Sequence, residues 1–193
     1  SREFDFPILE DECYADLLWN SKRPIALAAM DNGNRVIHCG SFSKTIAPAL
    51  RVGYLVADWH LLSQILAVKN DSGTGALEQM MLAEYCVNHF DDHVNKLSST
   101  LKDKLETLVE AVKVYFGTSA EFEVPEGGIF LWVSLPEHVD TIRLSQLAAK
   151  EGIAINPGPE WSTDTKPASS KLRLCFGHPS KKIIEEGLSL IHI

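Results

Sequence analysis

Hydrophobic and polar positions along the chain follow two periods, one typical of buried strands and one typical of amphipathic helices. In the first part of the chain, short apolar runs bounded by Asn, Gly, Pro or acidic residues predict strands. These predicted strands cover residues 8–13, 35–40 and 52–57. Asp58 then suits the N-cap of a helix over residues 59–69. The alternation of strands and helices predicts an α/β fold for this part.

The middle of the chain has a helical period, which predicts helices over residues 76–90 and 92–116. In the second helix, seven apolar residues recur at intervals of three or four: Val94, Leu97, Leu101, Leu105, Leu108, Val109 and Val112. This spacing predicts an amphipathic helix that packs on a core. Shorter elements follow Gly117. Strands are expected at 122–124, 128–135, 153–156 and 172–176, helices at 140–151 and 180–191, and a loop at 157–170. They predict a compact α+β unit.

Composition and charge narrow the possible functions. The net charge of -8 disfavours a nucleic-acid surface, because neutralising phosphates requires clustered Lys and Arg. The four cysteines form no CxxC pair, so a cysteine zinc site is not expected. There is no apolar run of about 18 residues, so no membrane helix is expected. No signal peptide is evident, which favours a cytoplasmic protein. A strand begins within a few residues of Ser1, so we expect that upstream sequence has been lost.

The segment from Gly40 to Tyr54 contains the most specific arrangement of functional side chains. Lys44 lies in a polar loop between two predicted strands, a position where lysine is commonly a solvent-facing charge. Here two serines, Ser41 and Ser43, precede the lysine, and Arg51 follows it. Hydroxyl and guanidinium groups are directional donors to phosphate oxygens. A lysine beside a bound phosphate could reach an aldehyde and form a Schiff base.

This segment closely resembles the S-x-S-K…R-x-G-Y signature of class I and II aminotransferases, which are pyridoxal-phosphate (PLP) enzymes of fold type I. The resemblance implies that Lys44 is the catalytic residue and forms the Schiff base with pyridoxal 5'-phosphate. It also implies that Ser41, Ser43 and Arg51 bind the cofactor phosphate.

A second motif, Leu9 to Tyr14, resembles the E-D-x-x-Y sequence that ends a strand in the same family. An exposed acidic turn is the alternative interpretation of its three acidic residues. The motif precedes Lys44 at the family's distance, since Asp11 lies 33 residues before the lysine. The resemblance implies that Asp11 pairs with the pyridine nitrogen and that Tyr14 binds the ring hydroxyl.

Further motifs lie in the second half of the chain. Residues 172–176 resemble the family's R-L-x-F strand, which implies that Arg173 binds the substrate carboxylate. A structural Asp or Glu is the alternative partner for an arginine between apolar residues. Residues 125–132 and 152–158 also resemble family segments, whereas residues 159–161 depart from the pattern of many relatives. This departure concerns side-chain specificity and not the fold.

Together these motifs predict an α/β fold in two parts. Residues 1–95 are expected to be the C-terminal part of a PLP-binding large domain with a mostly parallel sheet, truncated at its N-terminus. Residues 96–193 are expected to form a long linking helix and a small α+β domain. The implied function is amino-group transfer between an amino acid and a 2-oxo acid, in a full-length homodimer. This segment is expected to be inactive alone and to contact neither membrane nor nucleic acid.

Two other functions remain open on the same scaffold. The first is the effector domain of a MocR-type transcription regulator, in which PLP is a sensed ligand and the DNA-binding domain lies upstream. The second is a PLP-dependent lyase. The spacing from Lys44 to Arg51, with Pro48 between, resembles the branch that holds 2-aminoadipate, aromatic and MocR-type members.

Overall fold

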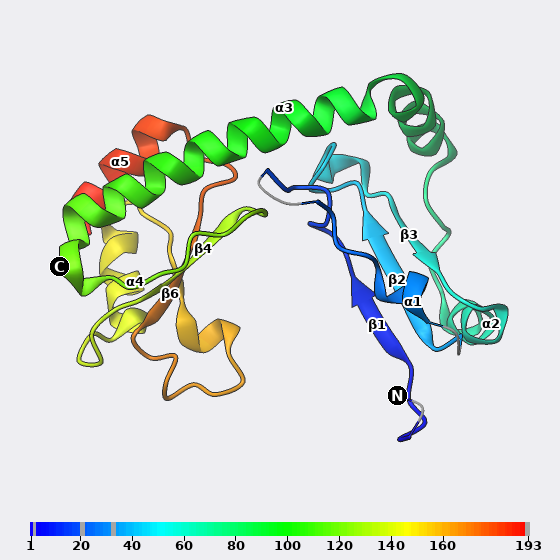
Figure 1. Cartoon of the computed structure of the whole chain (residues 1–193), viewed down its shortest axis with the longest axis horizontal. Coiled ribbons are helices and arrows are strands. Elements are labelled where there is room, and N and C mark those ends of the chain that lie inside the picture. Colours follow the sequence, from blue (N-terminus) through cyan, green and yellow to red (C-terminus); the bar gives the residue numbers. More distant parts are fainter. Residues whose placement is uncertain (2, 20–21, 32–33, 192–193) are drawn as a thin grey trace. The chain divides into compact units, whose positions relative to one another are not determined.

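The computed structural model describes residues 1–193 except 2, 20–21, 32–33 and 192–193. Its contacts divide the chain into two compact units, Ser1–Leu97 and Ser98–Ile193. The chain is a mixed α/β protein (Figure 1), as the sequence predicts. Assignment of the two units to a PLP-binding domain and a small domain remains a prediction.

The first unit contains a three-stranded sheet in the order β1–β2–β3 (Figure 1). The strands are β1 (Ile8–Asp11), β2 (Val36–Ser41) and β3 (Gly53–Val56). β1 and β2 are parallel, as predicted for this sheet, whereas β3 is antiparallel to β2. Because β1 and β2 are parallel, their carboxyl ends lie at the same edge of the sheet, the usual place for ligands in open α/β sheets.

Helices accompany this sheet. A single turn, α1 (Leu27–Met30), lies between β1 and β2, and the 3₁₀ helix η1 (Pro48–Leu50) precedes β3. After β3, the carboxylate of Asp58 accepts a hydrogen bond from the backbone N–H of His60 (2.9 Å) and caps α2 (Trp59–Val68). The N-cap predicted at Asp58 is therefore confirmed, because a short acidic side chain satisfies one of the free N–H groups of the first turn.

The second unit is built on an antiparallel sheet in the order β4–β6–β5. Its strands are β4 (Phe130–Ser134), β5 (Asn156–Pro157) and β6 (Lys171–Cys175). Alternate residues of β4 and β6 are buried and form one face of the sheet: Leu131, Val133, Leu172 and Leu174. The other face of these strands is half-buried or exposed. One face therefore belongs to the core, while the other is available for polar chemistry.

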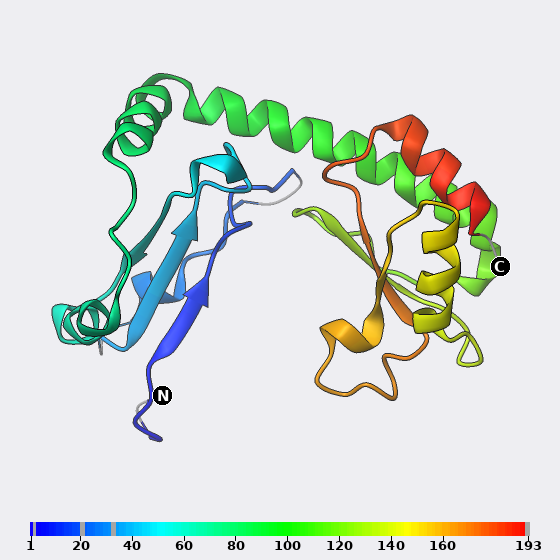
Figure 2. The same cartoon turned by 180° about the vertical axis from the view of Figure 1, so that it is seen from behind.

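Three helices contribute to the core of this unit. They are the C-terminal part of α3 (Ala76–Phe116), α4 (Thr141–Lys150) and α5 (Lys181–Leu190), which lie side by side in Figures 1 and 2. Their buried side chains include Leu105, Val112, Ala148, Ile184 and Leu188. Asp140 caps α4 and Ser180 caps α5 through side-chain oxygens. The predicted helices at 140–151 and 180–191 are thus present, each within a residue or so of its expected ends.

Other predicted elements differ from the structure. The two helices expected at 76–90 and 92–116 form one continuous helix, α3. The residues at the expected break are Asp91 and Asp92, and neither is a helix-breaking Gly or Pro. The strand expected at 122–124 is wrong: these residues form no strand, and the pairing nearby is a single bridge between Glu121 and Ser134. Of the strand expected at 153–156, only Asn156 belongs to β5, and the loop after it begins with a 3₁₀ helix, η3 (Gly158–Trp161). A further 3₁₀ turn, η2 (Gly117–Ser119), follows α3.

Among the residues that the structure describes, none of the helices combines the length and the apolar character that a membrane span requires.

Candidate active site

The loop after β2 is a hydrogen-bonded turn that presents Lys44 at its surface. The carbonyl oxygen of Phe42 accepts hydrogen bonds from the N–H groups of Ile46 (2.9 Å) and Ala47 (3.1 Å), which close the turn. The N–H of Phe42 donates to the carbonyl of Val52 and joins the loop to the start of β3. Thr45 is only 3% exposed, whereas its neighbour Lys44 is exposed. Thr45 therefore anchors the turn and leaves the lysine amine accessible.

Lys44 lies beside residues that follow β1. Its Nζ is 5.9 Å from the centroid of the Tyr14 ring, within the range of a cation–π contact. Glu12 donates its N–H to the carbonyl of Cys39 (2.9 Å), so the chain stays bonded to β2 just after β1 ends. The parallel strands thus place Lys44 and Tyr14 together, as expected if both belong to one site.

Asp11 ends β1, and its carboxylate is bonded by Cys13. Its Oδ1 accepts a hydrogen bond from the backbone N–H of Cys13 at 3.1 Å. Hydrogen bonds from the thiol and the N–H of Cys13 lower the pKa of Asp11 below its usual value. The hydrogen bond to Asp11, followed by partial burial, raises the pKa of the Cys13 thiol to about 11. Asp11 is therefore an anion and Cys13 a neutral thiol near pH 7.

The two serines and the arginine of the motif line one cavity of about 520 Å³. Ser41 accepts a hydrogen bond on its Oγ from the N–H of Ser43 (3.1 Å), so both hydroxyl groups belong to the same short turn. Arg51 follows η1 in the left-handed backbone region (φ 54°), and its guanidinium donates to the carbonyl of Pro48 at 3.2 Å. These three side chains bring donors suited to a phosphate group to a cavity whose remaining lining is largely apolar.

Gly40 is required for the packing of Tyr54 in the wall of this cavity. The two residues are partners in the register of β2 and β3. A Cβ atom on Gly40 would lie 2.2 Å from Cζ of Tyr54 and 2.4 Å from its hydroxyl oxygen. Only glycine lets the Tyr54 ring lie across β2, where it also contacts the rings of Phe42 and His38.

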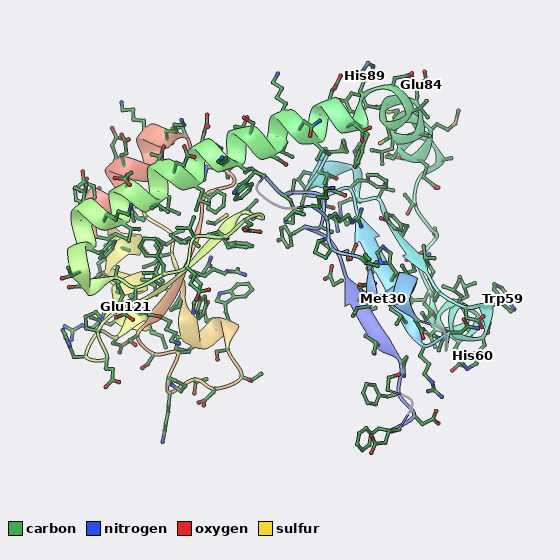
Figure 3. The ribbon with its side chains drawn as sticks, in the orientation of Figure 1. Met30, Trp59, His60, Glu84, His89 and Glu121 are labelled. Carbon is green, nitrogen blue, oxygen red and sulfur yellow. The ribbon has the colours of Figure 1, made fainter. Side chains whose placement is uncertain are left out.

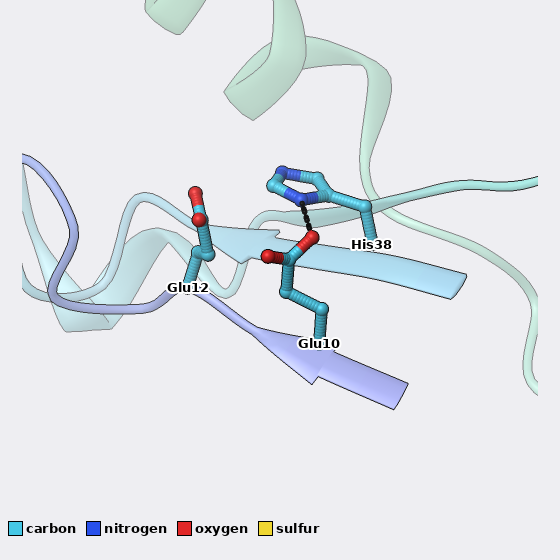
Figure 4. A group of neighbouring side chains, drawn as sticks. All are labelled: Glu10, Glu12 and His38. Atoms are coloured by element: carbon cyan, nitrogen blue, oxygen red, sulfur yellow. Dashed lines mark hydrogen bonds and ion pairs between the residues drawn. The ribbon is translucent and has the colours of Figure 1, made fainter. Parts of the chain in front are cut away.

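His38, on β2, packs against an acidic side chain of the neighbouring strand β1. His38 Nδ1 is 3.1 Å from Oε2 of Glu10 (Figure 4). The carboxylate of Glu10 also accepts hydrogen bonds from the backbone N–H groups of Leu27 (2.5 Å) and Ala28 (3.1 Å) at the start of α1. Glu12, which lies near Glu10 and His38 in Figure 4, forms an ion pair with Arg23. These side chains join α1 to the sheet and need no metal ion to account for them.

Arg173 lies in the second unit, at the centre of β6. The carbon atom of its guanidinium is 3.9 Å from the centroid of the Phe130 ring and 3.1 Å from that of Trp161. The sequence identified Arg173 as a candidate but gave no sign of these two aromatic contacts. The cluster of Asp11, Tyr14 and Lys44 belongs to the first unit, so the two groups are described separately.

Comparison with known proteins connects this geometry to a family. A family model for class I and II aminotransferases matches residues 1–189. NorG of Staphylococcus aureus (strain N315), an HTH-type transcriptional regulator, is 35% identical over 100% of this chain and 43% of its own length. An uncharacterised aminotransferase of Saccharolobus solfataricus is 30% identical over 96% of this chain and 47% of its own length. The chain thus spans less than half the length of these curated relatives.

Solved structures give the same result. A multiple substrate aminotransferase from Thermococcus profundus has a TM-score of 0.88 and 30% identity, over 99% of this chain and 48% of that structure. LysN, the α-aminoadipate aminotransferase of Thermus thermophilus, has a TM-score of 0.87 and 25% identity, over 98% of this chain and 50% of that structure. That structure is complexed with N-(5'-phosphopyridoxyl)-L-leucine. Sequence and fold agree over almost the whole chain, which therefore belongs to the class I and II aminotransferases.

Proposed function

We propose that the protein is a pyridoxal-phosphate-dependent aminotransferase that uses Lys44 to attach its cofactor. The observation that carries the proposal is the approach of Lys44, in the loop after β2, to the ring of Tyr14, which follows the end of β1 where Asp11 lies. Ser41 and Ser43, whose hydroxyl groups can donate to a phosphate, lie next to the lysine in the chain. The closeness of Lys44 and Tyr14 supports one site built from two separate motifs.

The residues present fit this cofactor, which is the one used by class I and II aminotransferases. Ser41, Ser43 and Arg51 line one cavity and would hold the phosphate. Asp11, kept ionised by Cys13, would bind the protonated ring nitrogen, and Tyr14 would bind the ring hydroxyl. When bound, the cofactor supplies an electron-withdrawing ring that makes the substrate Cα–H acidic.

The protein's own side chains would do the rest of the chemistry. Lys44, released by an incoming amino acid, would act as general base and take the proton from the substrate Cα. It would then act as general acid and return the proton to C4′ of the cofactor. Its exposed position at the surface of the turn leaves room for this movement. Arg173 would bind the substrate carboxylate through two parallel N–H groups. We also propose that the full-length protein acts as a homodimer in the cytoplasm.

The test uses the natural protein that carries this chain, incubated with pyridoxal phosphate and reduced with borohydride, which makes a lysine–pyridoxyl bond permanent. Peptide mapping should place the pyridoxyl group on Lys44 in the wild type. Lys44→Ala should lose it. Lys69→Ala is the matched control, because Lys69 lines the same cavity as the two serines. Label on Lys69, or label retained by Lys44→Ala, would show that the cofactor assignment is wrong.

A second function is supported by the similarity to NorG, a transcriptional regulator, over 100% of the chain. In a regulator of this kind, Lys44 and the serines would bind the cofactor as a signal, and turnover would not be required. Amino-group transfer from amino acids to a 2-oxo acid by the natural protein supports the enzyme. Labelling of Lys44 without such transfer, together with DNA binding that changes with pyridoxal phosphate, supports the regulator. Release of pyruvate without a 2-oxo acid would indicate a lyase.

A further inference from the structure

Arg173 projects from the face of the second sheet that is turned away from the core. Its neighbours along β6, Leu172 and Leu174, are 1% and 5% exposed and belong to the core face. Side chains alternate along a strand, so Arg173 lies on the opposite face. Its partners in register are Trp132 on β4 and Asn156 on β5, which are half-buried or exposed. The guanidinium is thus placed on a polar and aromatic surface within one unit.

Two rings lie against this guanidinium: Phe130, which begins β4, and Trp161, which ends η3. We call these two residues the aromatic clamp. Their centroids are 3.9 Å and 3.1 Å from the guanidinium carbon. Rings stack on the flat faces of a guanidinium, whereas its N–H groups point outward in its plane. The clamp therefore restricts the tilt of the plane in which the N–H groups can donate to a bidentate acceptor such as a carboxylate.

Trp161 is the member of the clamp whose position depends on a loop. It is 50% exposed, so one part of the indole contacts Arg173 while another part meets solvent. Gly158, at the start of η3, fixes this turn, because a Cβ there would lie 2.3 Å from the carbonyl oxygen of Ala168. The turn consequently packs directly on the backbone that leads into β6. The turn that carries Trp161 is thus fixed against the chain, while half of the tryptophan surface is exposed.

We propose that Trp161 is a positioning residue: with Phe130 it fixes the plane of the Arg173 guanidinium for a carboxylate ligand, and its indole senses the arrival of that ligand. This inference rests on the proposed function, in which Arg173 binds the substrate carboxylate. It adds that the aromatic clamp orients the Arg173 guanidinium before the ligand binds. Restricting a flexible side chain in its bound geometry strengthens binding, because less motion is lost on association.

The experiment measures binding of 4-methylvalerate, a carboxylate that cannot be transaminated, to the natural protein that carries this chain. The corresponding amide, 4-methylvaleramide, has the same shape without the charge. Trp161→Ala should weaken carboxylate binding by roughly 2- to 30-fold, the range of a cation–π contact converted to affinity. Trp161→Phe should stay within about 3-fold of the wild type, since phenylalanine keeps a ring over the cation. Amide binding should not change.

Fluorescence provides a readout that a merely structural role would not move. The carboxylate should change the tryptophan emission of the wild type, and Trp161→Phe should abolish that change. Trp59→Ala is the matched control, because Trp59 is 69% exposed at the start of α2 (Figure 3) and lies in the first unit. This control should keep both the affinity and the emission change.

Several outcomes would overturn the inference. Equal carboxylate affinity in the wild type and Trp161→Ala would do so, as would an equal loss in Trp161→Ala and Trp161→Phe. A loss of amide binding that matches the loss of carboxylate binding would also contradict it. Failure of the proposed function is distinguishable: a protein that transfers no amino group but binds the carboxylate in a Trp161-dependent way refutes the enzyme and keeps the aromatic clamp. In an active protein, Trp161→Ala should raise KM more than it lowers kcat.

Discussion

Replacing Gly158 by alanine adds a methyl group where the backbone leaves no room. The new Cβ would lie 2.3 Å from the carbonyl oxygen of Ala168 and 2.6 Å from that of Lys171. Neither atom is the end of a flexible side chain. Lys171 is paired with Ser134 in the β4–β6 ladder, so its carbonyl cannot withdraw without disturbing the sheet. The substitution should therefore push η3 away from β6.

The size of the effect follows from these distances. The shorter contact is about 1 Å inside the ordinary van der Waals range, and a second backbone oxygen blocks the escape of the methyl group. Overpacking of this kind costs about 1–3 kcal/mol, and two rigid contacts place Gly158→Ala near the upper end. Alanine also restricts the unfolded chain, which offsets about 0.4–1 kcal/mol. We expect a net loss of about 2 kcal/mol in the free energy of unfolding.

Denaturant unfolding measures this loss as a lower midpoint at unchanged slope. Gly187→Ala is the matched control, since Gly187 lies inside α5 and a Cβ there would meet nothing within 4 Å. The control should gain about 0.5–1 kcal/mol, because alanine is the better helix residue. The packing argument is refuted if Gly158→Ala unfolds within about 0.5 kcal/mol of the wild type while the control behaves as expected.

Three further predictions concern other parts of the chain. Alkylation of Cys13 should be slow at pH 8 and rise with an apparent pKa of about 11, and Asp11→Asn should lower that pKa. Because folding raises this pKa, the protonated thiol contributes fully to stability below its pKa in the unfolded chain. The contribution is lost as the pH rises through about 11. Unfolding measured as a function of pH tests whether stability falls in this range. Asp140→Ala removes an N-cap that accepts two backbone N–H groups and should cost about 1 kcal/mol by thermal unfolding. Phe176→Ala empties a site that is 0% exposed and should cost about 3–5 kcal/mol, measured by denaturant unfolding; a loss below 1 kcal/mol would contradict its place in the core.

The sequence predicts most elements because their signals are local. The strands around Lys44 are apolar runs bounded by turn residues, and the N-cap at Asp58 is one polar side chain before a helical period. The short helix α1 was not predicted. It is a single turn whose N–H groups are bonded by Glu10, a residue 17 positions before Leu27. No local pattern reports a partner at that distance.

In the candidate site, too, the sequence predicts the local features and misses the contacts between distant residues. The motif around Lys44 predicts three side chains that line the cavity, Ser41, Ser43 and Arg51, since they lie within eleven residues of one another in the chain. The hydrogen bonds from Cys13 to Asp11 were not predicted, because cysteine at that position is compatible with simple burial. The contact of Trp161 with Arg173 depends on how a loop folds back onto β6, which the spacing of residues does not determine.

The bond between Cys13 and Asp11 makes the thiol an indicator of the charge on the neighbouring carboxylate. The anion of Asp11 is the main reason that Cys13 holds its proton up to about pH 11. Any cation that pairs with Asp11 offsets this influence and lowers the pKa of the thiol. Thiol titration in the intact protein can therefore follow the electrostatic state of the site without a label and without turnover.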